Sequence, residues 1–114
     1  MKQIKFRAWT QDEKKMIYPT RITFAGKTSY CYVPSDDYEY QIDTENLMEY
    51  IGLKDKNQKQ IYEQDWLQDD DGRKYFIVWA EDEARFELEN SEDHSLRHIK
   101  DVKVMHIIGN NYEL

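Results

Sequence analysis

The chain is divided into short apolar or alternating runs, and each run ends at a polar, turn-forming segment. Residues 3–9 alternate between apolar and basic side chains, as a half-buried strand does. Residues 74–80 form the most apolar run and predict a central strand. Four or five such runs in the C-terminal half, joined by acidic turns, predict a small curled sheet or an SH3-like barrel.

Other segments complete a mainly β pattern, formally β-rich α+β. Residues 44–51 fit a short helix capped by Asp43 or Thr44, or a strand, and the short window favours the strand. Residues 90–98 predict a polar loop or one helical turn, and residues 102–108 predict a closing strand. Further strands are expected in the N-terminal half, over residues 16–18, 21–24, 28–33 and 38–42.

The length of 114 residues fits one domain with two sub-lobes. We expect these lobes over about 1–53 and 60–114, linked by the polar residues 54–59. Asp55 and Asn57 suit a tight turn there, because their side chains can hydrogen-bond to nearby backbone. Neither half has apolar residues to spare, so the two lobes are expected to pack together.

Between the two halves, the stretch Tyr50–Leu67 reads YIGLKDKNQKQIYEQDWL. It resembles the signature segment of the YopX family, small proteins of phages and prophages of Gram-positive bacteria, which typically reads Y-x-G-L-K-D-K-N-G-K-x-I-Y-E-G-D. Ile4–Trp9 and Ile107–Asn110 also resemble the two ends of the family. Gln58 and Gln64 stand where the family usually has glycine.

The resemblance implies one YopX-like domain over residues 1–114, a β-rich fold and a phage or prophage origin, but no activity. We expect no catalysis and no cofactor. The four glycines form no phosphate-binding loop, and none of the serines lies in a Gly-x-Ser-x-Gly motif. Cys31 lies in a run of Tyr and Val, which predicts a buried thiol.

Metal sites are not expected either. Asp69–Gly72 has the composition of a calcium loop but not its spacing, and predicts a hairpin turn. His94 and His98 are four residues apart, a zinc-ligand spacing, but no second ligand pair lies nearby in the sequence. His106 alternates with strand residues and is predicted to be partly buried and hydrogen-bonded.

The net charge of −7 is unevenly distributed along the chain. Residues 1–57 carry nine basic and nine acidic residues, and residues 58–114 carry seven basic and fourteen acidic residues. An acidic second lobe repels nucleic-acid phosphates and attracts a basic protein. We therefore expect an accessory protein that binds another protein, with host interference as the extension that the resemblance implies.

The residues expected to contact a protein partner are Trp9 and the acidic turn Glu81, Asp82 and Glu83. Trp9 lies off the parity of the apolar residues in its strand, so we expect it to face either the other lobe or a partner, which makes it a candidate interface aromatic. Trp66 and Trp79, in contrast, are expected in the core of the second lobe. Open sheet edges in so short a β-rich chain also make a homo-oligomer an expectation.

The alternative function is nucleic-acid binding, which we regard as the weaker hypothesis. Basic groups interleaved with aromatics can hold single strands. The candidate residues lie in the first lobe and in the turn 54–59: Lys5, Arg7, Lys54, Lys56 and Lys59.

The compartment is predicted from cysteine use and hydropathy. One cysteine excludes an intramolecular disulfide, which fits a reducing compartment. No segment approaches the roughly 18 apolar residues of a membrane span, and the N-terminus lacks the apolar core of a signal peptide. We expect a cytoplasmic protein of the bacterial host with no membrane partner.

Overall fold

The computed structural model describes residues 5–113, and the chain divides into two compact units. The described residues of the first unit are 5–49, and those of the second unit are 50–113. Both units consist of short antiparallel strands, so the prediction of a mainly β chain is confirmed. The boundary falls inside a strand, and residues 54–59, the predicted link, form a hairpin turn of the second unit.

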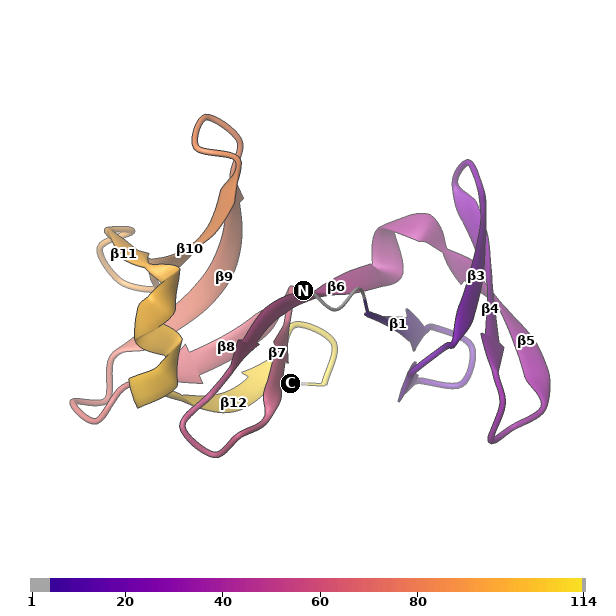
Figure 1. Cartoon of the computed structure of the whole chain (residues 1–114), viewed down its shortest axis with the longest axis horizontal. Coiled ribbons are helices and arrows are strands. Elements are labelled where there is room, and N and C mark those ends of the chain that lie inside the picture. Colours follow the sequence, from indigo (N-terminus) through magenta and orange to yellow (C-terminus); the bar gives the residue numbers. More distant parts are fainter. Residues whose placement is uncertain (1–4, 114) are drawn as a thin grey trace. The chain divides into compact units, whose positions relative to one another are not determined.

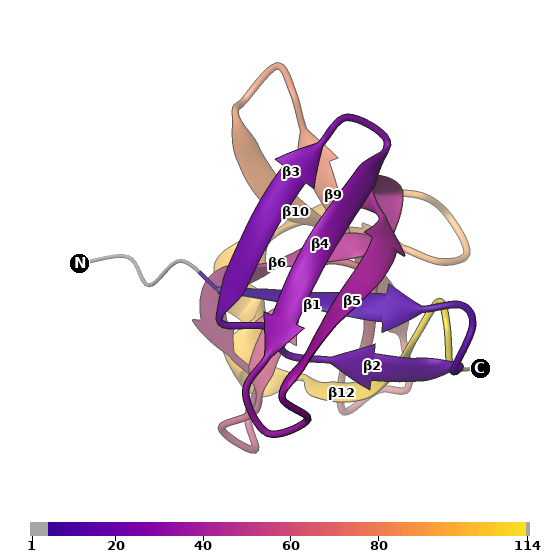
Figure 2. The same ribbon diagram turned by 90° about the vertical axis from the view of Figure 1, so that its right-hand side faces the viewer.

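In the first unit, β3, β4 and β5 form one antiparallel sheet, while β1 pairs with β2 and with residues 47–49 of β6. The β3-β4-β5 sheet crosses over β1 and β2 (Figure 2). The two sheets share a core of Ala8, Ile17, Cys31, Val33, Tyr40 and Ile42. The elements are β1 (Phe6–Thr10), β2 (Lys15–Ile17), β3 (Arg21–Ala25), β4 (Thr28–Val33), β5 (Tyr38–Asp43), η1 (Thr44–Asn46) and β6 (Leu47–Lys54).

Residues 44–51, for which the sequence allowed a helix or a strand, contain one 3-10 turn and a strand. η1 covers Thr44–Asn46, and β6 begins directly after it. The Thr44 amide donates to the Lys27 carbonyl (2.9 Å), and the Thr44 hydroxyl donates to the Gly26 carbonyl (2.8 Å). The β3–β4 hairpin therefore holds this turn, and the Asp43 side chain makes no capping hydrogen bond.

The second unit contains a five-stranded antiparallel sheet in the order β11-β10-β9-β8-β12, together with β7, which pairs with residues 50–54 of β6. It curls into a half-barrel, as predicted, with η2 between β11 and β12 (Figure 1). Its core consists of Ile51, Ile61, Leu67, Tyr75, Ile77, Leu88, Val102 and Met105. The elements after β6 are β7 (Gln60–Tyr62), β8 (Asp65–Gln68), β9 (Lys74–Ala80), β10 (Arg85–Asn90), β11 (Leu96–His98), η2 (Ile99–Val104) and β12 (His106–Asn110).

Two predictions near the C-terminus are wrong in detail. Residues 99–104 form the 3-10 helix η2, and the last strand begins only at His106. Residues three apart lie on the same side of a 3-10 helix, so Val102 and Met105 both reach the core. Residues 96–98 form the edge strand β11 rather than a loop, because their backbone pairs with β10 despite a polar sequence.

Candidate functional site

The acidic turn predicted to contact a partner lies at the tip of the β9–β10 hairpin. This hairpin extends beyond the neighbouring strands of its unit (Figure 1). The Glu83 amide donates to the Ala80 carbonyl and the Ala84 amide donates to the Glu81 carbonyl, each at 3.2 Å. The turn is therefore ordered by its own backbone, and Glu81, Asp82 and Glu83 are all exposed.

A hollow of about 340 Å³ lies beside this turn. Leu96, on the edge strand β11, lines this hollow and is 57% exposed. Glu87 is buried, and its carboxylate accepts a hydrogen bond from Arg85 Nε at 2.9 Å. Sequence reasoning missed Glu87 and Leu96 because it did not predict β11. The hollow is lined by Ala80, Glu81, Asp82, Glu83, Glu87 and Leu96.

The prediction that Trp79 is a core residue is wrong. Trp79 is 50% exposed, and its ring packs edge-on against Phe86 at a centroid distance of 4.9 Å. The core of the unit ends at Ile77 on this strand, so the hairpin carries Trp79 beyond it. Trp66 is partly buried, and its Nε1 donates to Asn111 Oδ1 at 2.6 Å.

The candidate interface aromatic of the first unit, Trp9, is buried. It is 8% exposed, because β1 is covered on both faces. Arg7 is also buried, with Nε 3.4 Å from Met48 Sδ. Arg7 therefore cannot contact phosphates, while Lys5 is partly exposed.

The other basic candidates surround the β6–β7 turn of the second unit, where Lys54, Lys56 and Lys59 are exposed. Lys56 Nζ lies 3.0 Å from Asp70 Oδ1, so one of the three charges already has an acidic neighbour. The predicted basic residues are thus divided between the units, and one of them, Arg7, is buried.

The signature segment performs a structural task in this turn. Asp55 is 2% exposed. Its Oδ1 accepts the amides of Asn57 (2.8 Å) and Lys59 (2.9 Å), and its Oδ2 accepts the amide of Ile107 (3.0 Å). Three backbone donors compensate the buried carboxylate. Asp55 therefore shapes the turn and attaches it to β12.

The two glutamines that depart from the family pattern both have left-handed backbone. Gln58 has φ +66° and Gln64 has φ +73°, a region that glycine adopts without steric cost. The usual glycines of the family thus match the turn geometry found here. At Gln64 a side-chain hydrogen bond with Asn111 offsets part of the strain.

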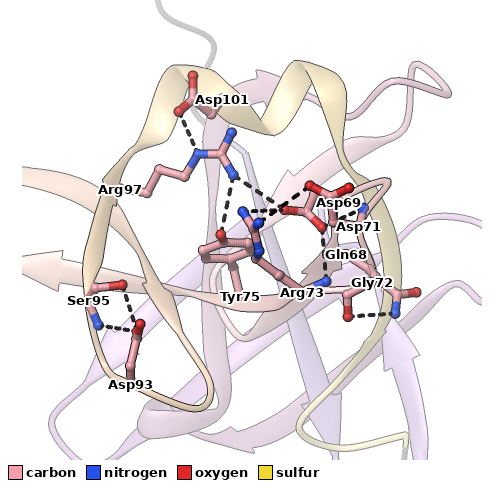
Figure 3. A network of polar contacts seen from close by, with 10 residues as sticks. All are labelled: Gln68, Asp69, Asp71, Gly72, Arg73, Tyr75, Asp93, Ser95, Arg97 and Asp101. Carbon is pink, nitrogen blue, oxygen red and sulfur yellow. Dashed lines mark hydrogen bonds and ion pairs between the residues drawn. The ribbon is translucent and has the colours of Figure 1, made fainter.

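Polar residues around Arg97 connect the β8–β9 turn, β9, β11 and η2 (Figure 3). Arg97 Nε donates to Asp101 Oδ2 at 2.8 Å, and Nη1 lies 3.3 Å from Tyr75 Oη and 3.5 Å from Asp69 Oδ2. The bond to Asp101 is the main reason that the pKa of Arg97 lies above its ordinary value. Since each group is paired, we assign this network a structural role. Asp69–Gly72 forms the predicted turn, closed by the Gly72 amide on the Asp69 carbonyl.

The histidines do not converge. His94 Nδ1 lies 3.1 Å from Glu89 Oε2, while His98 Nδ1 accepts the Lys100 amide at 3.1 Å. Within residues 5–113, no group of three or more His, Cys, Asp or Glu side chains is arranged to hold a metal. The prediction for His106 is wrong in one respect, because its buried Nδ1 has no hydrogen-bond partner in the described structure.

The Cys31 thiol is buried as predicted, and burial raises its pKa to about 11. No helix within the described residues is long and apolar enough to cross a membrane.

Comparisons with known proteins agree on family and fold. A family model described as YopX protein matches residues 5–114. The crystal structure of protein EF1440 from Enterococcus faecalis is similar, with a TM-score of 0.66 and 24% sequence identity over 99% of this chain and 96% of that chain. At this identity the likeness shows the fold alone. No curated protein matches.

Proposed function

This chain belongs to the YopX family, and we propose that it is a non-catalytic phage or prophage accessory protein that acts by binding another protein in the cytoplasm of the bacterial host. Interference with a host protein is the natural extension of this role. The proposal is supported by the family and by the acidic hairpin of the second unit.

The observation that carries the proposal is the hollow beside the β9–β10 turn. It combines the predicted acidic residues with Glu87 and the exposed Leu96. Glu83 and Glu87 are paired with Arg85, at 3.7 and 2.9 Å. Among the described residues, the carboxylates of Glu81 and Asp82 have no such pair. A partner segment that places a basic residue beside an aliphatic one fits this surface.

The test is an affinity pull-down from bacterial host lysate, with and without nuclease, read by mass spectrometry. The full chain is compared with a triple variant, Glu81→Lys, Asp82→Lys and Glu83→Lys. A control, Glu39→Lys, Glu45→Lys and Glu92→Lys, has the same net charge and alters exposed residues outside the hollow.

We expect a discrete protein that the parent and the control retain and the hairpin variant loses. Binding should weaken as salt rises, because exposed charges are screened. Equal recovery of the partner by all three proteins would show that the hairpin is not the contact surface. Leu96→Ser tests the apolar part of the hollow, and it should reduce recovery without changing the salt dependence.

Nucleic-acid binding is an outcome that the same experiment detects. Recovery that disappears with nuclease would move the function to the lysines around residues 54–59, whose exposure permits such contacts.

Self-association of the chain stays a prediction. β3 and β5 are the edge strands of their sheet, and light scattering across a concentration series would detect pairing of the chain through such edges.

A further inference from the structure

The first unit contains a second hollow, of about 400 Å³. Its lining residues come from β5, the edge strand of the three-stranded sheet, from the end of β1, from the loop that follows β1, and from η1. This volume falls within the usual range for ligand sites, about 300–1,000 Å³. All of its lining residues belong to the first unit.

Aromatic side chains supply part of the wall: Trp9, Tyr38 and Tyr40. Tyr38 is 57% exposed, and its ring meets Tyr40 edge-on at a centroid distance of 4.7 Å and an angle of 71°. Tyr40 is buried, and its hydroxyl donates to Asp36 at 2.6 Å. The exposed Tyr38 ring is therefore held against a fixed neighbour, which reduces the entropy lost when a ligand packs on it.

The charged residues that line this hollow are all acidic. Asp12, Glu13 and Asp43 line it, and none of the lining residues is Lys or Arg. Glu13 pairs with Lys15 at 3.6 Å. In the described structure, the carboxylates of Asp12 and Asp43 have no ion-pair or hydrogen-bond partner. Asp43 stands at the N-cap position of η1 yet does not cap it, so its carboxylate is available to a ligand.

Tyrosine rings with adjacent carboxylates favour an organic cation. The ring faces attract cations, and the carboxylates accept charge-assisted hydrogen bonds. The chain already shows the first interaction, since Lys15 Nζ lies 5.1 Å from the centroid of the Tyr40 ring. A guanidinium group matches best, because it is planar, stacks on an aromatic ring and donates to more than one carboxylate.

We propose that this hollow, which we call the cation cleft, binds the side chain of an arginine in a peptide segment. The guanidinium would lie against Tyr38, with Asp12 and Asp43 as its acceptors. The cation cleft is independent of the acidic hairpin, because no residue lines both hollows. Each proposal can therefore fail without the other.

The test is a titration of the isotope-labelled full chain, followed by two-dimensional amide NMR. The probe is the blocked peptide acetyl-Gly-Arg-Gly-amide. Matched peptides carry lysine or the neutral isostere citrulline in place of arginine. We expect saturable shifts at the Trp9 indole and at the amides of Tyr38 and Asp43. The affinity order should be arginine, then lysine, with no saturation by citrulline.

Two variants locate the site. Asp12→Asn with Asp43→Asn removes both free carboxylates and should weaken binding of the arginine peptide by about tenfold. Glu39→Asn with Glu45→Asn makes the same charge change at exposed positions outside the cation cleft and should leave the affinity unchanged. Well-dispersed spectra of both variants establish that they fold.

Three results would overturn the proposal. The first is the absence of saturable shifts with the arginine peptide. The second is equal binding of the citrulline peptide, which would make the charge irrelevant. The third is an equal loss of affinity in both double variants, which would show attraction to net charge rather than a site. A hairpin variant with all three acidic residues changed to lysine should retain shifts at the cation cleft.

Discussion

Asp55 and Asp69 close two hairpin turns of the second unit with the same set of hydrogen bonds. In each turn Oδ1 accepts the amides two and four residues later, at 2.8 and 2.9 Å for Asp55 and at 3.0 and 2.9 Å for Asp69. The residue three positions later has positive φ, +66° at Gln58 and +84° at Gly72. An ion pair between the residues that follow each aspartate, Lys56 and Asp70, joins the two turns.

The first prediction concerns the buried carboxylate of Asp55. Asp55→Asn should lower the free energy of unfolding by about 2 kcal/mol, because an amide has only one acceptor oxygen and leaves a partly buried backbone donor unpaired. Urea denaturation followed by circular dichroism measures the change. Asp82→Asn, at an exposed position, should change stability by less than about 0.5 kcal/mol. Equal stability of the parent and Asp55→Asn would contradict this role.

The second prediction concerns the left-handed position of Gln58. Gln58→Gly should raise the free energy of unfolding by about 0.5–1 kcal/mol, since the strain relieved exceeds the extra chain entropy of glycine. Gln58 is exposed, and its side chain has no hydrogen bond in the described structure. The control is Gln60→Gly in β7, which should destabilise the protein because glycine weakens a strand. Thermal unfolding of both variants shows whether each substitution raises or lowers the stability of the protein.

The third prediction concerns acid titration of Asp36. The hydrogen bond from Tyr40 is the main cause that holds the pKa of Asp36 below its ordinary value, and the charge of Lys15 adds to it. Because the folded pKa is the lower one, this contribution to stability is present above the unfolded pKa, about 3.9, and is lost as the pH falls through the folded pKa. Tyr40→Phe should move the pKa of Asp36 upward.

Carbon-13 NMR of the Asp36 carboxyl carbon, between about pH 2 and pH 6, measures this shift. The control is Tyr32→Phe, which removes a hydroxyl that donates to Asp37 at 2.9 Å. This variant should leave the pKa of Asp36 unchanged. An unchanged midpoint in Tyr40→Phe would mean that the hydrogen bond does not set the pKa.

The fourth prediction concerns the reactivity of Cys31. The thiol is fully buried, and its pKa of about 11 leaves roughly one thiolate in a thousand at about pH 8. We expect the native protein to react with Ellman's reagent only as fast as it unfolds, and the denatured protein to react at once. A cysteine placed on the exposed strand β3, Thr23→Cys in a Cys31→Ala background, should react rapidly without denaturant. Rapid reaction of native Cys31 would contradict its burial.

The acidic site was predictable in part. Glu81, Asp82 and Glu83 form a local run between two alternating segments, and such a run predicts an exposed turn wherever the hairpin lies. Glu87 and Leu96 join the hollow only through the β10–β11 pairing, which opposes Glu87 to His98 and Glu89 to Leu96. Because β11 is short and polar, no local pattern indicated that pairing.

The tryptophans show the same limit. Trp79 lies in the most apolar run of the chain, yet half of it is exposed, because the core ends before the hairpin does. Trp9 lies off the alternation of its strand, yet it is buried, because β1 is covered on both faces. The exposure of a side chain depends on which faces of its strand are covered by other segments of the chain. The alternation of residues within the strand does not predict which faces are covered.

The sequence by itself determined the β class, most strand positions, the turn built on Asp55 and the family. Alternation, turn chemistry and motif spacing act over a few residues, so they can be read locally. Only the tertiary structure decided which acidic and aromatic side chains share a hollow. The cation cleft joins Asp12 to Asp43 across 31 positions, and strand pairing and packing between distant segments create such neighbours.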